Sequence, residues 1–242
     1  SLSYIFTHIQ KAGGTSISGY LMDRHLEQLS YIDHNFDKDG TPSDIAARTF
    51  SKKTFSYPNK HTPLNVWRHY LSPEEFDSYF KFAFTRNPFH RLVSLYIHRI
   101  KFDYCKERHL DPENFSVNIK DILSGKFPAL GHRVGNHTHE VTFDYFVREY
   151  MCGGTVSSQL AYLCDEQGNF LTDFIGKTEN MQHDFDIVCD TIEIPKGKLS
   201  NLNSGNNDVK LYMEMYSPDL KKFFYDTNRT EFEALEYDNN LF

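Results

Sequence analysis

The chain has 242 residues, of which 39% are hydrophobic and 24% charged, a composition typical of a globular protein rather than a disordered or fibrous one. Its formal net charge is -7, which argues against broad binding to nucleic acid or to an anionic membrane surface. No run approaches the roughly 18 apolar residues of a membrane span, so the sequence predicts none in this chain. No linker or repeat divides the sequence, and we expect one domain over residues 1–242.

The chain opens with the pattern of a strand, a glycine turn and a helix. Residues 3–9 form a short β-prone run, and Gly13 and Gly14 follow it. Apolar residues then recur with helical spacing over 15–26, which predicts an amphipathic helix.

The same order returns with clearer boundaries. Ser72-Pro73-Glu74-Glu75 is a capping box with proline at the first helical position, so a helix begins there. Residues 81–85 alternate as a strand, and Asn87-Pro88 opens a helix whose apolar stripe continues to Ile100.

Further elements follow in the second half. We expect a helix over 143–150, a strand over 170–175, a helix over 180–189 and a late helix from Ser217-Pro218. Alternating strands and helices indicate an α/β fold, in which helices flank both faces of a central parallel sheet. Ligands of such sheets bind at the carboxyl ends of the strands.

The turn after the first strand has the residues of an anion cradle. Two glycines allow close approach of the backbone to a ligand, and the helix that follows presents N–H groups to an anion. Lys11 adds a charge, while Thr15 and Ser16 add hydroxyl donors. The lysine precedes both glycines, so this is not a Walker A loop. The alternative is an ordinary Gly-Gly turn with a helix cap.

A second group of donors follows the strand 81–85. Arg86 stands where that strand ends, and Ser94 lies two turns into the next helix. Arginine presents a planar fork of donors that suits a phosphate, and serine completes such a contact. Between Lys81 and Arg108 there are seven Lys or Arg and two acidic residues, a local charge of +5. The alternative is a solvated basic helix whose arginines pair with nearby acids.

The two motifs, in this order, resemble the cofactor-binding elements of the sulfotransferases, most closely the carbohydrate-type family of bacterial and Golgi enzymes. The similarity covers nearly the whole chain. Its motifs are Lys11-Ala12-Gly13-Gly14-Thr15-Ser16, Arg86-Asn87-Pro88 with Arg91, Ser94 and Tyr96, Ser158-Gln159-Leu160, Asp173-Phe174-Ile175-Gly176-Lys177 with Glu179, Asn180 and Asp184, Leu202-Asn203-Ser204, and Tyr216, Asp226 and Tyr237. Gln10 stands where the family usually has proline.

The resemblance implies a three-layer fold like that of the P-loop NTPases, and the donor 3′-phosphoadenosine 5′-phosphosulfate (PAPS) as co-substrate, with no metal. It implies that the loop holds the 5′-phosphosulfate, with Lys11 as a catalytic stabiliser of the leaving group, and that Arg86 and Ser94 anchor the 3′-phosphate. The expected donor-binding residues are Lys11, Ala12, Gly13, Gly14, Thr15, Ser16, Arg86 and Ser94. Sulfuryl transfer then depends mostly on positioning and electrostatics.

A hydroxyl acceptor needs a general base, and histidine suits that role near neutral pH. We expect His69, just before the helix that Ser72 caps, to be this base, with His61 as second choice. His8 lies on the strand that enters the cradle, and we expect it to fix the loop.

The segment 131–140 holds three histidines and one glutamate. His137 and His139 could bind a transition metal, but the segment lacks the helical spacing of zinc enzymes and is interpreted as a loop. We expect it to border the acceptor cleft, and we expect acceptor specificity over 106–140. The acceptor is a glycan or another hydroxyl-bearing molecule, and its identity and the oligomeric state remain open.

Two other functions remain as alternatives: a P-loop-type small-molecule kinase, and a non-catalytic nucleotide-binding module that Gln10 alone favours. The kinase lacks the Gly-Lys-Ser/Thr order and an evident magnesium carboxylate. Four scattered cysteines without a zinc spacing favour buried thiols and a cytoplasmic location. The alternative is the lumenal catalytic domain of a Golgi enzyme without its anchor.

Overall fold

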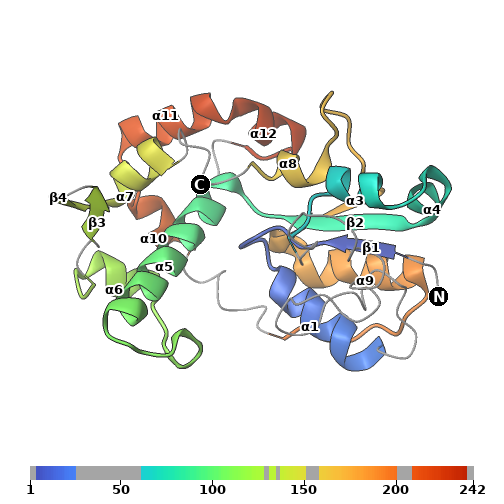
Figure 1. Ribbon diagram of the computed structural model, residues 1–242, viewed down its shortest axis with the longest axis horizontal. Helices are drawn as coiled ribbons and strands as arrows, with labels where there is room; N and C mark the ends of the chain where they lie inside the picture. The colour runs from blue at the N-terminus through green and yellow to red at the C-terminus, as the bar shows by residue number, and fades with distance from the viewer. Residues whose placement is uncertain are drawn as a thin grey trace. The chain divides into compact units, whose positions relative to one another are not determined.

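The computed structural model describes residues 4–25, 61–127, 131–134, 137–150, 158–200 and 209–238. The chain divides into two compact units (Figure 1). Ser1–Arg86 and Ser158–Leu202 make up the first unit, and Asn87–Ser157 and Asn203–Phe242 make up the second.

Three parallel strands form the sheet of the first unit. They are β1 (Tyr4–Thr7), β2 (Phe80–Thr85) and β5 (Phe174–Lys177), and β2 lies between the other two. Thr7 pairs with Ala83, and Thr85 pairs with Lys177. Because the strands are parallel, their carboxyl ends lie at one edge of the sheet.

The strand expected over 170–175 begins later than its sequence pattern indicated. It starts at Phe174, and Phe170 instead forms an isolated antiparallel bridge with Cys164. The turn between these two residues holds Phe170 out of the parallel sheet, because the bridge uses its main chain.

Helices α1 (Gly14–His25) and α9 (Met181–Ile192) cover one face of this sheet, as Figure 1 shows. Alternate strand residues supply the apolar surface that they cover, as the two-residue period of a strand requires. The buried cluster includes Tyr4, Ile17, Tyr20, Leu21, Phe82, Phe84, Phe185, Val188 and Ile192.

Helices α3 (Leu64–Tyr70) and α4 (Pro73–Ser78) pack on the other face. Ile5, next to Tyr4 along β1, packs there with Leu64, Trp67, Leu71 and Phe76. The capping box is present as expected, because Ser72 Oγ accepts from the Glu75 N–H and the Glu75 carboxylate accepts from the Ser72 N–H. An α/β fold with a small parallel sheet flanked by helices is thereby confirmed.

Short elements also lie in the described part of the first unit. They are α8 (Leu160–Leu163), which contacts α3, and η4 (Thr178–Asn180), a 3₁₀ turn between β5 and α9. The expected helix over 180–189 corresponds to α9.

Aromatic side chains form the core of the second unit. Helix α5 (Pro88–Glu107) begins at the Asn87 cap, whose Oδ1 accepts from the Phe89 N–H. The ring of Phe89 lies 5.2 Å from that of Tyr216 and 4.9 Å from that of Phe232, between ring centroids. The helices that follow Asn203 are α10 (Val209–Glu214), α11 (Pro218–Thr227) and α12 (Arg229–Ala234).

The middle of the second unit differs from its sequence-based description in two places. The expected helix over 143–150 is a short α7 (Phe143–Tyr145) followed by the π-helical turn η3 (Phe146–Tyr150). Residues 131–140, interpreted as a loop, contain an antiparallel pair, β3 (Gly131–Val134) with β4 (His137–Glu140). The described residues between α5 and β3 also form η2 (Pro112–Asn114) and α6 (Ile119–Leu123). Within the described ranges, no helix is long and apolar enough to cross a membrane.

Candidate functional site

The turn between β1 and α1 is a tight loop at the carboxyl edge of the sheet. Lys11 has a φ of 62° and Gly13 a φ of 76°, both in the left-handed region. The Ala12 N–H donates to the Ile9 carbonyl, and the Ser16 N–H donates to the Gly13 carbonyl, each at 3.2 Å. A left-handed lysine is strained, and such strain concentrates at functional sites.

The backbone conformation favours glycine at position 13, where φ is 76°, and the His8 ring leaves little room for a larger residue at position 14. A Cβ on Gly13 would lie 1.7 Å from Met181 Cε, and a Cβ on Gly14 would lie 2.0 Å from His8 Cδ2. The loop therefore rests on the start of α9 on one side and on a buried histidine on the other.

The loop has the donors of an anion cradle. The N–H groups of the first turn of α1 point out of its amino end, where the helix dipole favours negative charge. Lys11 and Ser16 are half-buried beside them, and Thr15 is exposed. The close approach that the glycines allow and the donor set both fit a phosphate or sulfate group.

Arg86 joins this loop from the end of β2. Its Nη1 donates to the Lys11 carbonyl at 3.4 Å. Its main-chain N–H and carbonyl bond to the side-chain amide of Gln159, at 2.9 and 2.8 Å. The structure therefore brings Lys11 and Arg86 together, although 75 positions separate them in the sequence.

Ser94, the expected partner of Arg86, lies on α5 in the second unit and is half-buried. Its role as a phosphate ligand stays a prediction.

Two cations of the basic stretch from Lys81 to Arg108 pair with acidic side chains. Lys81 Nζ is buried at the start of β2, where it donates to the carbonyls of Phe76 and Tyr79 and lies 3.0 Å from the Asp173 carboxylate. Arg99 pairs with Asp103 on the exposed part of α5. Arg99 fits the alternative of a basic helix whose arginines pair with nearby acids, whereas Lys81 is buried at the start of a strand.

Two histidines lie against the loop. His8 is buried, and its Nδ1 lies 3.4 Å from the Ser18 hydroxyl on α1. His61 Nδ1 donates to the His8 main-chain carbonyl at 2.7 Å, and the two rings are 4.7 Å apart between centroids. His61 thus stands at the carboxyl end of β1, and His8 supports the Gly14 end of the loop as expected.

His69 lies elsewhere on the same unit. It is exposed in the last turn of α3, and its Nδ1 donates to the Asn65 carbonyl at 2.6 Å. Helix α3 begins beside His61 and leads through α4 to the first residue of β2. The chain therefore runs away from the carboxyl edge of the sheet between His61 and His69.

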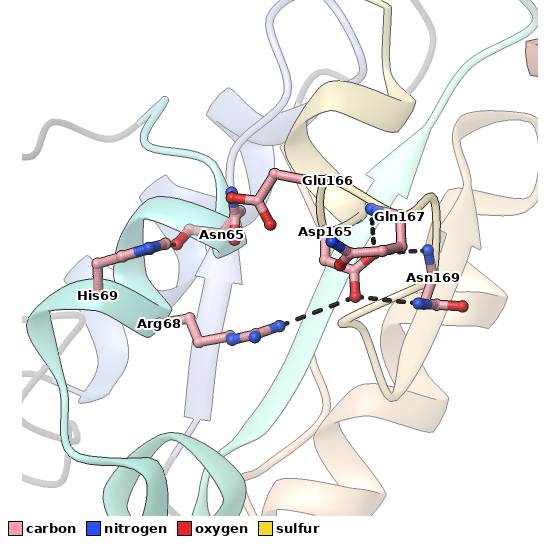
Figure 2. A network of polar contacts seen from close by, with 7 residues as sticks. All are labelled: Asn65, Arg68, His69, Asp165, Glu166, Gln167 and Asn169. Carbon is pink, nitrogen blue, oxygen red and sulfur yellow. Dashed lines mark hydrogen bonds and ion pairs between the residues drawn. The ribbon is translucent and has the colours of Figure 1, made fainter.

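A polar network holds this helix on the turn after α8 (Figure 2). Asn65 Nδ2 donates to Glu166 Oε1 at 2.7 Å, and Arg68 lies 3.8 Å from the Asp165 carboxylate. Hydrogen bonds from the Asn169 side chain and main chain hold the pKa of Asp165 below its ordinary value, and the Asn65 amide lowers the pKa of Glu166 in the same way. Sequence analysis missed this network, because its members lie a hundred positions apart.

The histidine-rich segment lies on β3 and β4 in the second unit, where His132 pairs in register with His139. Tyr96 on α5 donates to the Val141 carbonyl at 2.8 Å and so fixes the end of β4. Among the residues that the structure describes, no three His, Cys, Asp or Glu side chains gather as a metal site would require.

The model of the sulfotransferase family matches residues 2–238. No curated protein and no solved structure shows significant similarity to the chain.

Proposed function

The chain belongs to the sulfotransferase family, and on that premise we propose that it transfers a sulfuryl group from PAPS to a hydroxyl of a carbohydrate-type acceptor. Membership supports sulfotransfer in general, and the donor, the acceptor and the site residues are our inference. We treat residues 1–242 as one sulfotransferase domain with a fold of the P-loop type, which the match over 2–238 supports.

The observation that carries the proposal is the contact between Arg86 and the Lys11 loop. PAPS carries a phosphate on the 3′ position and a phosphosulfate on the 5′ position, so its protein needs two anion sites a ribose apart. The Arg86 guanidinium lies 3.4 Å from the Lys11 carbonyl, beside the amino end of α1. Arginine suits the 3′-phosphate, because its donors form a planar fork. The start of a helix, with lysine beside it, suits the 5′-phosphosulfate.

The reaction is an in-line displacement at sulfur. The acceptor oxygen forms a bond to sulfur while the bond between sulfur and the bridging phosphate oxygen breaks. The products are a sulfate ester and adenosine 3′,5′-bisphosphate (PAP). Negative charge grows on the bridging oxygen, and Lys11 at the loop stabilises it. The loop glycines hold the backbone close to the leaving group.

The acceptor hydroxyl gives its proton to a histidine. We propose His61 for this role rather than His69, because His61 is bonded to the residue that supports the loop. A carbonyl oxygen only accepts, so the proton of the neutral His61 ring is on Nδ1 and its Nε2 is the basic atom. The acceptor hydroxyl would reach the site from the side of His61.

The first test is calorimetric titration with PAP and with AMP, which lacks only the 3′-phosphate. We expect PAP to bind much more tightly than AMP, and we expect Lys11→Ala and Arg86→Ala to weaken PAP binding. Arg229→Ala removes an exposed arginine that pairs with Asp226, and this control should leave PAP binding unchanged. Equal affinity for both nucleotides would overturn the proposal. Thermal stabilisation by ATP with magnesium, and not by PAP, would favour a kinase instead.

A further inference from the structure

The side-chain amide of Gln159 makes two hydrogen bonds to the main chain of Arg86, one to its N–H and one to its carbonyl. Gln159 is fully buried. Its Oε1 accepts from the Arg86 N–H at 2.9 Å, and its Nε2 donates to the Arg86 carbonyl at 2.8 Å. A carboxamide offers the same acceptor and donor as a peptide group, so Gln159 pairs with Arg86 as a neighbouring strand would.

This pairing acts where the strand ladder stops. The pairing of β2 with β5 ends at Thr85 and Lys177, and its pairing with β1 ends at Ala83. Arg86 is the next residue, and the chain then leaves the first unit at Asn87. The Gln159 amide continues the hydrogen bonding of the central strand by one residue, and this limits the main-chain torsions of Arg86.

A fixed main chain also fixes the direction in which the side chain of Arg86 leaves its Cα. Because the Arg86 guanidinium donates to the Lys11 carbonyl, the direction of this side chain also affects the loop. Gln159 is neutral, and it holds Arg86 without cancelling the positive charge. A carboxylate at this position would pair with the guanidinium and compete with an anionic ligand.

We propose that Gln159 is a positioning residue, which aims Arg86 at the 3′-phosphate of the nucleotide. This inference rests on the proposed function. A positioning role differs from a purely stabilising one, because it affects the binding of one part of the ligand only. Loss of the amide should weaken the contribution of the 3′-phosphate and leave the rest of the nucleotide affinity in place.

The measured quantity is the ratio of the Kd for AMP to the Kd for PAP. Gln159→Met keeps the volume of the side chain and removes both hydrogen bonds. We expect it to lower the ratio about tenfold or more, which corresponds to about 1.4 kcal/mol, while the Kd for AMP changes little. In an Arg86→Ala background the same substitution should have no further effect on the ratio, because the group that Gln159 orients is already absent.

Gln182 supplies a matched control in the same unit. Its Oε1 accepts from the Leu199 N–H at 2.9 Å, and its Nε2 donates to the Gly197 carbonyl at 3.1 Å and to the Asp186 carboxylate at 2.8 Å. Gln182→Met also removes an amide that accepts from one main-chain N–H and donates to one main-chain carbonyl, but these belong to Leu199 and Gly197 and not to Arg86. It should lower the melting temperature and leave the ratio unchanged.

The outcomes distinguish this inference from the proposed function. A wild-type chain that does not prefer PAP overturns the proposed function. A wild-type chain that prefers PAP, with the ratio unchanged in Gln159→Met, overturns the role of Gln159 alone. Gln159→Glu is a second variant, which keeps one acceptor and adds a charge, and it should also lower the ratio. Failure of both variants to fold, seen as loss of the thermal transition, would assign Gln159 a structural role and overturn the inference.

Discussion

His61 Nδ1 donates to the main-chain oxygen of His8 at 2.7 Å, and His8 in turn packs against Gly14. The hydrogen bond fixes the tautomer of His61, because a carbonyl oxygen accepts only. It also ties the orientation of the His61 ring to the residue that supports the loop. A histidine held in this way has a basic Nε2 and a constrained ring, as a general base requires.

We expect His61→Ala to lower kcat by about 10²-fold or more, the usual contribution of a general base. The Kd for PAP should change little, because the base acts on the acceptor. His69→Ala provides the comparison, since His69 is exposed in the last turn of α3, the helix that follows His61. Steady-state kinetics with a sulfated-product assay measures kcat for both variants. A large loss in His69→Ala with His61→Ala near wild type would return the base to His69.

Gly14→Ala should weaken PAP binding and lower stability. Its Cβ would lie 2.0 Å from the His8 ring, so the ring must move away from its contact with Ser18. We expect a cost of about 1–3 kcal/mol, as for other overpacked sites.

Gly19→Ala is the matched control on the same helix. A Cβ at Gly19 meets nothing within 4 Å, and alanine should stabilise α1 slightly because it favours helix more than glycine does. Thermal melting and PAP titration compare the two variants. Equal melting temperatures and equal affinities would show that the His8 contact does not constrain the loop.

Asp165→Asn should destabilise the chain near neutral pH but not in strong acid. The Asn169 amide, the main-chain N–H groups of Asn169 and Gln167, and Arg68 hold the pKa of Asp165 below its ordinary value of 3.8. A carboxyl with a lowered pKa contributes stability above its unfolded pKa and loses it as the pH falls through the folded value. The difference in melting temperature between wild type and Asp165→Asn should therefore be present near pH 7 and shrink below 3.8. A difference in melting temperature that is the same near pH 7 and below pH 3.8 would contradict this ionic role.

Cys189 should resist alkylation in the folded chain. Burial, with smaller contributions from Asp186 and Asp190, raises the pKa of its thiol to about 12. Only the thiolate reacts with iodoacetamide, so little reactive form exists near pH 8. Peptide mapping after brief labelling should find Cys189 unmodified in the native chain and modified in denaturant. Similar labelling in both states would mean that the α9 core opens readily.

Local signals in the sequence placed several elements well. The Ser72 capping box, the proline at the start of α5 and the glycine pair at the start of α1 all act through neighbouring residues, and each lies where its pattern predicted. The family was also recognisable from the loop and arginine motifs, since both are short and contiguous. Such features need no distant partner.

Patterns failed where another segment decided the conformation. Residues 131–140 pair as two strands although their composition predicted a loop. Phe170 has the residue type of a strand, but its bridge to Cys164 keeps it out of the sheet. In both cases the outcome depends on a hydrogen-bonding partner that periodicity does not identify.

The sequence by itself determined the family and the parallel α/β order, because residue type and spacing carry both. Tertiary structure alone decided which cations and histidines meet. Arg86, which follows β2, lies at the loop, while Lys81 near the start of β2 is held by Asp173. His61 reaches His8 while His69 does not, because α3 runs away from the edge where β1 ends. These distances depend on how strands and helices pack, which no local pattern encodes.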